Sequence, residues 1–504
     1  MTWPSDIFLY NQDAPLLFTR LYFWVFLLVA LTFYAVLYKK RALRNIYLFL
    51  ISLFFYYKTS GLFFLLLVFS TLSDYLIGMA IYHFRARAWK KAMVALSVTI
   101  NLGVLSYFKY AYFFTDLFNR TFRTDLEVVN YLALWANNLS GSHFDASVIF
   151  LPVGISFFTF QTISYAVDVY RGKCQPVKNI IDFGFYVSFF PQLVAGPIVR
   201  ASEFVPQLYA KYSLTHKEFG FALWMIMKGL FKKMVLGDYL AVNFIDRVFD
   251  TPTLYTGFEN LMALYGYSLQ VYCDFAGYTD IAIGVALLLG FRLPKNFNSP
   301  YKAENVGDFW RRWHISLSSW LKDYLYIPIG GNRKGKLRTN INLMVTMLLG
   351  GLWHGADMKF IIWGGLNGVG LIIYKFWKKI SPYENKKNIW VHIWKIFLTF
   401  NFITFTRIWF RADDMDRVNA MLFQLTRSMD LSVVPEVIGS FKLVFGVMIF
   451  GYILHWLPQG WKDAWMNWFI RIPHWAKVII VVVLVFLIYQ SQTSDLQPFI
   501  YFQF

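Results

Sequence analysis

The sequence predicts an all-α polytopic membrane protein, and three observations lead to this fold class. Of the 504 residues, 57% are hydrophobic and 21% are aromatic, whereas only 15% are charged. An average chain is closer to about 45–50% apolar. The apolar residues are spread over the whole length and recur in runs, several of which approach the roughly 20 residues that a helix needs to cross a bilayer. We therefore expect one membrane domain over residues 1–504, rather than a soluble domain with an anchor.

Thirteen apolar segments are candidate helices. The first, 21–38, is long and lacks a small-residue cleavage site, so it predicts a span rather than a signal peptide. Several others are too short or too polar to cross simply, so we expect roughly 11–14 helical elements, some of them re-entrant or buried in the protein. The other candidates are 45–57, 62–82, 93–114, 148–169, 180–198, 219–236, 261–289, 341–353, 360–376, 391–410, 443–457 and 476–489.

Within the single domain, three parts are expected in order. Residues 1–146 are predicted to form N-terminal spans, 147–380 a core with re-entrant segments, and 381–504 further spans and an aromatic tail. Segment 305–320, inside the core, has helical character and many aromatic residues, and it fits a short amphipathic or re-entrant helix better than a span.

Basic residues cluster at the ends of the apolar segments. Placing the basic loops after the first, third and fifth segments in the cytoplasm puts the N-terminus outside. The net charge of +19 then reflects topology and contact with anionic lipid headgroups, so we expect no nucleic-acid partner. The three loops contain Lys39, Lys40, Arg41 and Arg44; Arg85, Arg87, Lys90 and Lys91; and Arg171, Lys173 and Lys178.

One histidine stands at the end of an uncharged run. Residues 340–353 carry no charge, and His354 follows them directly. An ionisable group at membrane depth is costly, so it marks a candidate functional site. An imidazole with a pKa near about 6.5 suits general-base catalysis, and the nearby glycines allow a substrate or helix to approach closely. The alternative is a buried histidine that only bonds a neighbouring helix.

A second histidine lies in a dense aromatic and basic motif. His314 follows Arg311, Arg312 and Trp313 in the sequence FWRRWH. The alternative reading is an interfacial aromatic belt with snorkelling arginines. The remaining histidines lie near loops or segment ends and are expected to be surface or packing residues: His83, His143, His216, His392, His455 and His474.

Two carboxylates lie in apolar surroundings. Asp274 and Asp280 could orient a histidine, pair with Arg311 or Arg312, or line a polar tunnel. Structural ion pairing is the favoured reading. A spacing of six residues does not place them on one face of a helix, so the sequence does not support a mechanism with paired carboxylates.

Three further patterns carry less weight as evidence for a function. Segment 330–337 nearly matches a phosphate-binding loop, but Leu337 replaces the hydroxyl residue that would bind magnesium, so a basic loop able to attract an anionic donor is the better reading. Cys174 and Cys273 are far apart and give no metal spacing. The C-terminal segment 498–504 is aromatic to its last residue, which by itself suggests an interfacial anchor.

Together these motifs resemble the membrane-bound O-acyltransferase family. The likeness is greatest to the bacterial branch that contains the membrane subunit of alginate O-acetylation and the transporter-like subunit of teichoic-acid D-alanylation. It runs from about Pro152 to His354, and the segments that carry it are 189–198 (FFPQLVAGPI), 270–280, 309–314, 323–332 and 352–356.

The resemblance implies an acyltransferase built around a central tunnel open to both sides of the membrane. Its key histidine would be His354, with His314 near the cytoplasmic side, and Tyr501 of the aromatic tail would be an acyl acceptor. Substrate contacts are expected from Arg311, Arg312, Trp313, Trp353, Asp274, Asp280 and Asn332.

The resemblance also suggests the substrates and partners. Acetyl-CoA would be the donor, and we expect no bound cofactor or metal. The acceptor would be an alginate-type polysaccharide outside a bacterial inner membrane. A secreted or membrane-anchored serine esterase-like acetyltransferase would complete the transfer. The alternatives are D-alanyl transfer to a cell-wall polymer, and a transporter or flippase without covalent chemistry.

Overall fold

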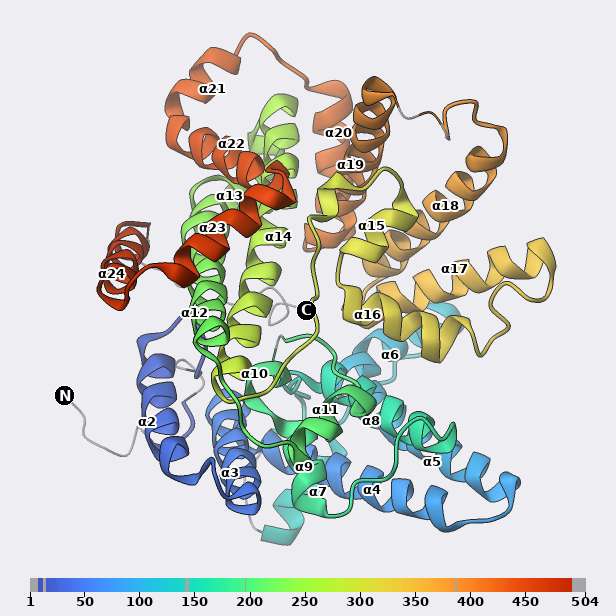
Figure 1. Ribbon diagram of the computed structural model, residues 1–504. Coiled ribbons are helices and arrows are strands. Elements are labelled where there is room, and N and C mark those ends of the chain that lie inside the picture. Colours follow the sequence, from blue (N-terminus) through green and yellow to red (C-terminus); the bar gives the residue numbers. More distant parts are fainter. Residues whose placement is uncertain are drawn as a thin grey trace.

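The computed structural model describes residues 8–491 except 12–14, 141–144, 195, 385 and 387, and of Ser140 it describes only the backbone. Within these residues the chain is made of helices and the short segments that join them, without a β-strand (Figure 1). The predicted all-α class is therefore confirmed.

The helices follow one another in three groups along the chain. The first group is α2 (Leu21–Leu37), α3 (Arg41–Ser60), η1 (Gly61–Phe63), α4 (Phe64–His83), α5 (Arg87–Leu105), η2 (Ser106–Tyr110), α6 (Ala111–Phe122) and α7 (Tyr131–Ser140). The second group is α8 (Ile155–Tyr170), α9 (Ile180–Ser188), α10 (Phe190–Leu193), α11 (Ala201–Tyr209), α12 (His216–Leu230), η3 (Phe231–Asp238), η4 (Ala241–Ile245), α13 (Asp246–Asp250), η5 (Pro252–Leu254) and α14 (Gly257–Leu288). The third group is η6 (Pro300–Lys302), α15 (Val306–Arg312), α16 (Ile315–Trp320), η7 (Leu321–Tyr326), α17 (Gly335–His354), α18 (Met358–Ile380), α19 (Ile389–Arg411), α20 (Met415–Arg427), α21 (Val434–Ser440), α22 (Lys442–Trp456), α23 (Gln459–Arg471) and α24 (His474–Ser491).

Six helical stretches of the described chain are long and apolar enough to cross a membrane, and the pair α21–α22, bent by 87°, would make a seventh. The chain is therefore a polytopic membrane protein. Full-length spans are fewer than the apolar segments of the sequence because several segments are broken. Segment 180–198, for example, leaves helical conformation at Phe189 and resumes in the four-residue α10, which has a proline in its first turn.

The centre of the molecule is α14, which runs beside α12 (Figure 1). Inside the protein, 89% of its apolar window is buried, against 11% for α24. Gly229 and Gly277 allow the close approach of α12 and α14, because a Cβ on Gly277 would lie 2.7 Å from the Gly229 carbonyl oxygen. A helix that is buried over most of its length is a core element, so α14 supports the site rather than facing lipid.

The segment predicted as one short helix over 305–320 forms two. Helix α15 ends at Arg312 and α16 begins at Ile315, with His314 between them. The third group of helices packs in pairs: α17 lies against α18, and α18 against both α15 and α19. This arrangement brings the FWRRWH motif to the end of α17.

Candidate active site

His354 is the last residue of α17, at the point where the chain turns into α18. Helices α17 and α18 are close to each other because Gly351 packs against the Phe360 carbonyl and Gly364 against the Met347 carbonyl, where a Cβ would collide with the backbone. Asp357 caps α18 by accepting a 2.8 Å hydrogen bond from the Lys359 amide. The imidazole is therefore carried at a rigid corner.

The carbonyl groups at the end of α17 are bound by side chains from the N-terminal part of the chain. Lys109 Nζ donates to the carbonyl oxygens of Trp353 and His354 at 2.9 and 3.0 Å, and the Tyr110 hydroxyl donates to that of Leu352 at 2.9 Å. These are the carbonyls that lack partners within a helix, and a cation at this end also interacts well with the helix dipole. The sequence analysis did not single out Lys109, although a lysine within the apolar run 93–114 was the available signal.

Aromatic rings surround the His354 imidazole. The ring centroids of Trp353, Trp363 and Phe410 lie 5.0, 5.1 and 5.2 Å from its own, each at a steep angle. His354 and its three neighbours are all buried. The imidazole is thus held in an apolar environment, away from bulk water.

His314 lies close to this group. The Trp353 ring contacts both histidines, since its centroid is 6.0 Å from that of His314. The Asn296 Oδ1 atom accepts from His314 Nδ1 at 3.3 Å, and from the Ser316 amide and hydroxyl at 3.1 and 2.9 Å. This binding holds His314 in the left-handed region, with φ of 43°, which is uncommon for a residue with a side chain and occurs most often at functional sites.

Trp313 contacts an arginine that the sequence analysis did not identify. The Arg407 guanidinium lies 4.3 Å from the Trp313 ring centroid and 5.5 Å from that of Phe410. The signal would have been a cation inside the apolar run 391–410. We call the buried group around Trp353 the histidine cluster; it consists of Trp313, His314, Trp353, His354, Trp363 and Phe410.

The other predicted contacts lie outside this cluster. Arg311 is on the surface with 71% of its side chain exposed, and Arg312 binds Asp308 at 2.7 Å. Asn332 is exposed in the loop before α17. These residues can meet a ligand arriving from solvent, but they do not surround His354.

Asp274 and Asp280, both on α14, bind lysines of α12 and η3. Asp274 pairs with Lys233, and Asp280 accepts from Lys232 and Lys228 at 2.9 and 3.2 Å. Neither aspartate has an ion pair with Arg311 or Arg312 among the described residues. Of the roles considered from the sequence, the geometry favours structural ion pairing.

The remaining predictions concern the aromatic tail and metal binding. Tyr501 lies outside the described residues, so its role stays a prediction. Among the residues that the structure describes, no group of three or more His, Cys, Asp or Glu side chains is close enough together to hold a metal ion.

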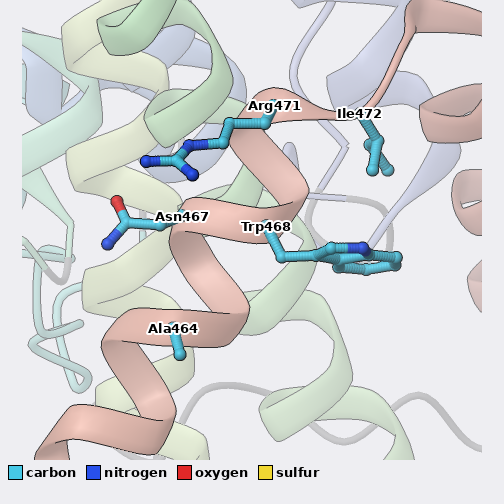
Figure 2. Close-up of a pocket in the computed structure, with 5 residues that line it drawn as sticks. All are labelled: Ala464, Asn467, Trp468, Arg471 and Ile472. Atoms are coloured by element: carbon cyan, nitrogen blue, oxygen red, sulfur yellow. The ribbon is translucent and has the colours of Figure 1, made fainter.

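Two cavities of the described structure differ in their relation to the histidines. One, of about 80 Å³, is lined by Lys109, residues 151–157 and Trp353, the residue that precedes His354 and whose ring contacts both histidines. The other, of about 460 Å³, is an open groove along α23, where Asn467 and Arg471 point to one side of the helix and Trp468 and Ile472 to the other (Figure 2). No predicted site residue lines the larger groove, so we place the candidate active site at the smaller cavity.

The arrangement can perform acid–base chemistry on a substrate shielded from water. A buried imidazole next to a small cavity can take a proton from a hydroxyl group, and its aromatic surroundings limit hydrolysis of a reactive acyl donor. A second imidazole one tryptophan ring away can bind or relay a proton.

Comparison with known proteins agrees with this chemistry. The family model of the membrane-bound O-acyltransferase family matches residues 177–411, a range that includes both histidines of the cluster and Arg407. The resemblance inferred from the motifs is thereby confirmed.

Individual relatives extend the match beyond that range. A peptidoglycan O-acetyltransferase of Helicobacter pylori is 37% identical over 427 residues, which cover 79% of this chain and 77% of the relative. A probable alginate O-acetylase AlgI of Pseudomonas putida is 41% identical over 353 residues, 69% of each chain. A teichoic acid D-alanyltransferase of Bacillus subtilis is 31% identical over 272 residues, 50% of this chain and 67% of the relative. With its motifs, its helices and these matches in agreement, the chain belongs to the membrane-bound O-acyltransferase family and is a multi-pass membrane acyltransferase.

Proposed function

We propose that this protein passes an acetyl group from cytoplasmic acetyl-CoA across a bacterial inner membrane, for O-acetylation of an extracytoplasmic polysaccharide. The observation that carries the proposal is the position of His354, a buried imidazole at the end of α17, where the Trp353 ring contacts both His354 and His314 and also lines a small cavity. His354 acts as the general base and the aromatic rings exclude water.

The chemical step is an acyl transfer. An acceptor hydroxyl loses its proton to His354 Nε2 or Nδ1 while its oxygen attacks the thioester carbonyl carbon. The carbon–sulfur bond then breaks, and the thiol of coenzyme A leaves with a proton returned from His354. His314 lies on the cytoplasmic side of this step and helps to guide the donor inward.

The donor docks on the positively charged surface near the FWRRWH motif. Exposed Arg311, partly exposed Arg312 and the segment 333–338, which leads into the first turn of α17, supply guanidinium and ammonium groups that suit the phosphates of coenzyme A. Asn332, directly before this segment, is also exposed. We assign this surface to the cytoplasmic side because it is basic, like the loops whose placement in the cytoplasm puts the N-terminus outside.

The first acceptor is Tyr501 in the aromatic tail. A phenol with a pKa near about 10 is more acidic than a sugar hydroxyl, so a base of moderate strength suffices. A secreted or membrane-anchored serine esterase-like partner then moves the acetyl group to the polymer. The names of two relatives, a peptidoglycan O-acetyltransferase and a probable alginate O-acetylase, support a polysaccharide as the final acceptor.

D-alanyl transfer is the second candidate, because one relative is a teichoic acid D-alanyltransferase with 31% identity. Transport without chemistry is disfavoured by membership of an acyltransferase family. An assay of thiol release separates these three possibilities: acetyl-CoA turnover supports the main proposal, turnover of a D-alanyl thioester alone supports the second, and no turnover of either supports transport.

The test of the proposal measures coenzyme A release by purified protein and O-acetyl groups on the polymer in cells. His354→Ala should lower both by at least about 10²-fold, the usual contribution of a general base. His83→Ala is the matched control, since His83 is exposed and hydrogen-bonds to the Met79 carbonyl of its own helix. Normal acetylation by His354→Ala would refute the mechanism. Tyr501→Phe should stop acetylation of the polymer; unchanged acetylation would make the tail an anchor only.

A further inference from the structure

Arg407 is a cation deep inside the protein. It lies on α19 and only 1% of its surface is exposed, which makes it one of the largest fully buried side chains in the described structure. A charged group in such a place loses most of its hydration and must be compensated by partners.

The described residues supply no hydrogen-bond acceptor to this guanidinium. Nε and both terminal nitrogens have no hydrogen-bond acceptor among the described residues. The neutral Tyr301 hydroxyl lies nearby, but outside hydrogen-bond geometry for these nitrogens, and it donates its own proton to the Ser268 carbonyl. Arg411, one turn further along α19, is different, because it binds Asp246 at 2.8 Å and Asp413 at 3.4 Å.

The contacts that Arg407 does make place it at the histidine cluster. Its guanidinium lies over the Trp313 ring at 4.3 Å and near the Phe410 ring at 5.5 Å, and the centroid of Phe410 is 5.2 Å from that of His354. Arg407 and His354 are close enough for the positive charge of the guanidinium to act on the His354 imidazole. A stack on tryptophan contributes to holding the guanidinium flat, but it satisfies none of its five N–H groups.

Other unsatisfied polar groups lie in the same region. The Tyr267 hydroxyl is fully buried, has no hydrogen-bond partner among the described residues and lies within range of the Arg407 charge. The Trp310 Nε1 group also has no acceptor there, and its ring is 5.8 Å from that of Trp363, which contacts His354. These groups are all donors, so the ligand that completes the site carries an acceptor, most naturally an oxygen with negative charge.

We propose that Arg407 binds the carbonyl oxygen of the transferred acyl group and stabilises the negative charge that develops on it. The inference rests on the proposed acyl transfer and adds a group to it. As the acceptor oxygen bonds to the carbonyl carbon, the electron pair of the C=O bond moves to its oxygen, and the guanidinium donates hydrogen bonds to that oxyanion. When the carbon–sulfur bond breaks, the pair returns to re-form C=O and the thiol leaves with the proton held by His354.

The test compares Arg407→Met with Arg411→Met, a control that removes a paired cation from the same helix. Arg407→Met replaces the unbranched stem of arginine with a flexible apolar side chain that can pack among the aromatic rings, so the variant should fold. We expect kcat for coenzyme A release to fall about 10²- to 10³-fold, with KM changed by less than about threefold, because the lost interaction forms only in the transition state. Its thermal unfolding midpoint should equal or exceed that of the wild type, because a buried cation without acceptors is removed.

The control variant Arg411→Met should lose stability and keep its kcat, the opposite of Arg407→Met. Arg411→Met leaves Asp246 unpaired, so its unfolding midpoint falls while the folded fraction keeps the wild-type kcat. Arg407→Lys, which keeps the charge but not the planar fork, should recover part of the lost kcat.

Two results would overturn the assignment of Arg407: a wild-type kcat in Arg407→Met, or a loss of activity that only follows a lowered unfolding midpoint, as for a structural residue. If the wild-type protein itself releases no thiol from acetyl-CoA or a D-alanyl thioester, the proposed function fails and the assignment fails with it. Thiol release by the wild-type protein therefore separates a failure of the proposed function from a failure of the Arg407 assignment alone.

Discussion

The protein buries positive charge in two regions, and the two are built differently. Between η3 and α14, each buried lysine has a carboxylate: Lys233 binds Asp274 and, at 2.7 Å, Asp238, while Lys232 binds Asp280 at 2.9 Å. At the histidine cluster, Arg407 is buried as deeply, but its guanidinium lies over the Trp313 ring and its nitrogens have no hydrogen-bond acceptor among the described residues.

The difference separates a structural role from a binding role. Inside a membrane protein, a buried charge that pairs with an opposite charge regains part of the energy lost with its hydration. Removing one partner leaves the other charge buried without that attraction. An unpaired buried charge keeps its capacity to bind, so it is expected where a substrate must be recognised. The comparison therefore predicts that the two regions respond to mutation with opposite signs in stability.

The largest effect on stability is expected for Lys233→Met. The substitution leaves Asp238 and Asp274 facing each other in a buried site without their cation. The free energy of unfolding should fall by roughly 3–5 kcal/mol. Thermal unfolding of purified protein, followed by loss of the monodisperse peak in size-exclusion chromatography, measures the change.

Lys211→Met is the control for that experiment, since Lys211 is exposed and lies at the surface between α11 and α12. The contrast between the two regions is lost if Lys233→Met unfolds at the wild-type temperature, or if Arg407→Met destabilises the protein as much as Lys233→Met does.

A smaller effect, on both stability and activity, is expected for Lys109→Met. Two hydrogen bonds from a charged group to the end of α17 are lost, and a charged hydrogen bond of this kind contributes about 1.5–3 kcal/mol. Because these bonds hold the carbonyls next to the imidazole, kcat for thiol release should fall while KM for acetyl-CoA stays near its original value.

Lys109→Arg keeps a cation at the same place and should restore much of the lost kcat. If Lys109→Met lowers stability but leaves kcat unchanged in the folded fraction, Lys109 only stabilises the fold, and it belongs with the paired region rather than with the histidine cluster.

The smallest effect on stability is expected for Arg311→Gln. With 71% of its side chain exposed and a 3.5 Å ion pair to Asp308, Arg311 should contribute within about 0.5 kcal/mol to the free energy of unfolding. Its expected effect is on the donor: KM for acetyl-CoA should rise and should depend less on salt, because one contact with a phosphate is removed.

Arg427→Gln, an exposed arginine on α20, is the matched control and should leave KM unchanged. If both variants give the same KM and the same salt dependence as the wild type, the phosphates of the donor bind elsewhere.

Much of the fold and part of the site could be predicted from the sequence. The helical class followed from hydropathy, and Trp313, His314, Trp353 and His354 were recognised because each lies in a short, dense motif. The structure brings these four residues together. Breaks such as the one at Phe189 were not predicted, because hydropathy does not register where an apolar segment leaves helical conformation.

The residues that were missed are cations within apolar runs. Lys109, Lys233 and Arg407 each lie within a segment predicted as a helix, with no motif around them. Their importance depends on partners far away in sequence: Lys109, for example, meets carbonyls 244 and 245 residues later. The argument that made His354 a candidate, an ionisable group at membrane depth, applies equally to these lysines and this arginine.

The bond between Lys109 and the end of α17 also limits how far the protein can be divided. The range that matches the family model, 177–411, begins well after η2, so it leaves out the lysine and tyrosine that hold the carbonyls beside His354. A fragment confined to that range would keep both histidines and Arg407 but would lose the support of the helix that carries His354. We therefore expect that the smallest autonomous catalyst obtainable from this chain includes the N-terminal helices as well as the family's shared segment.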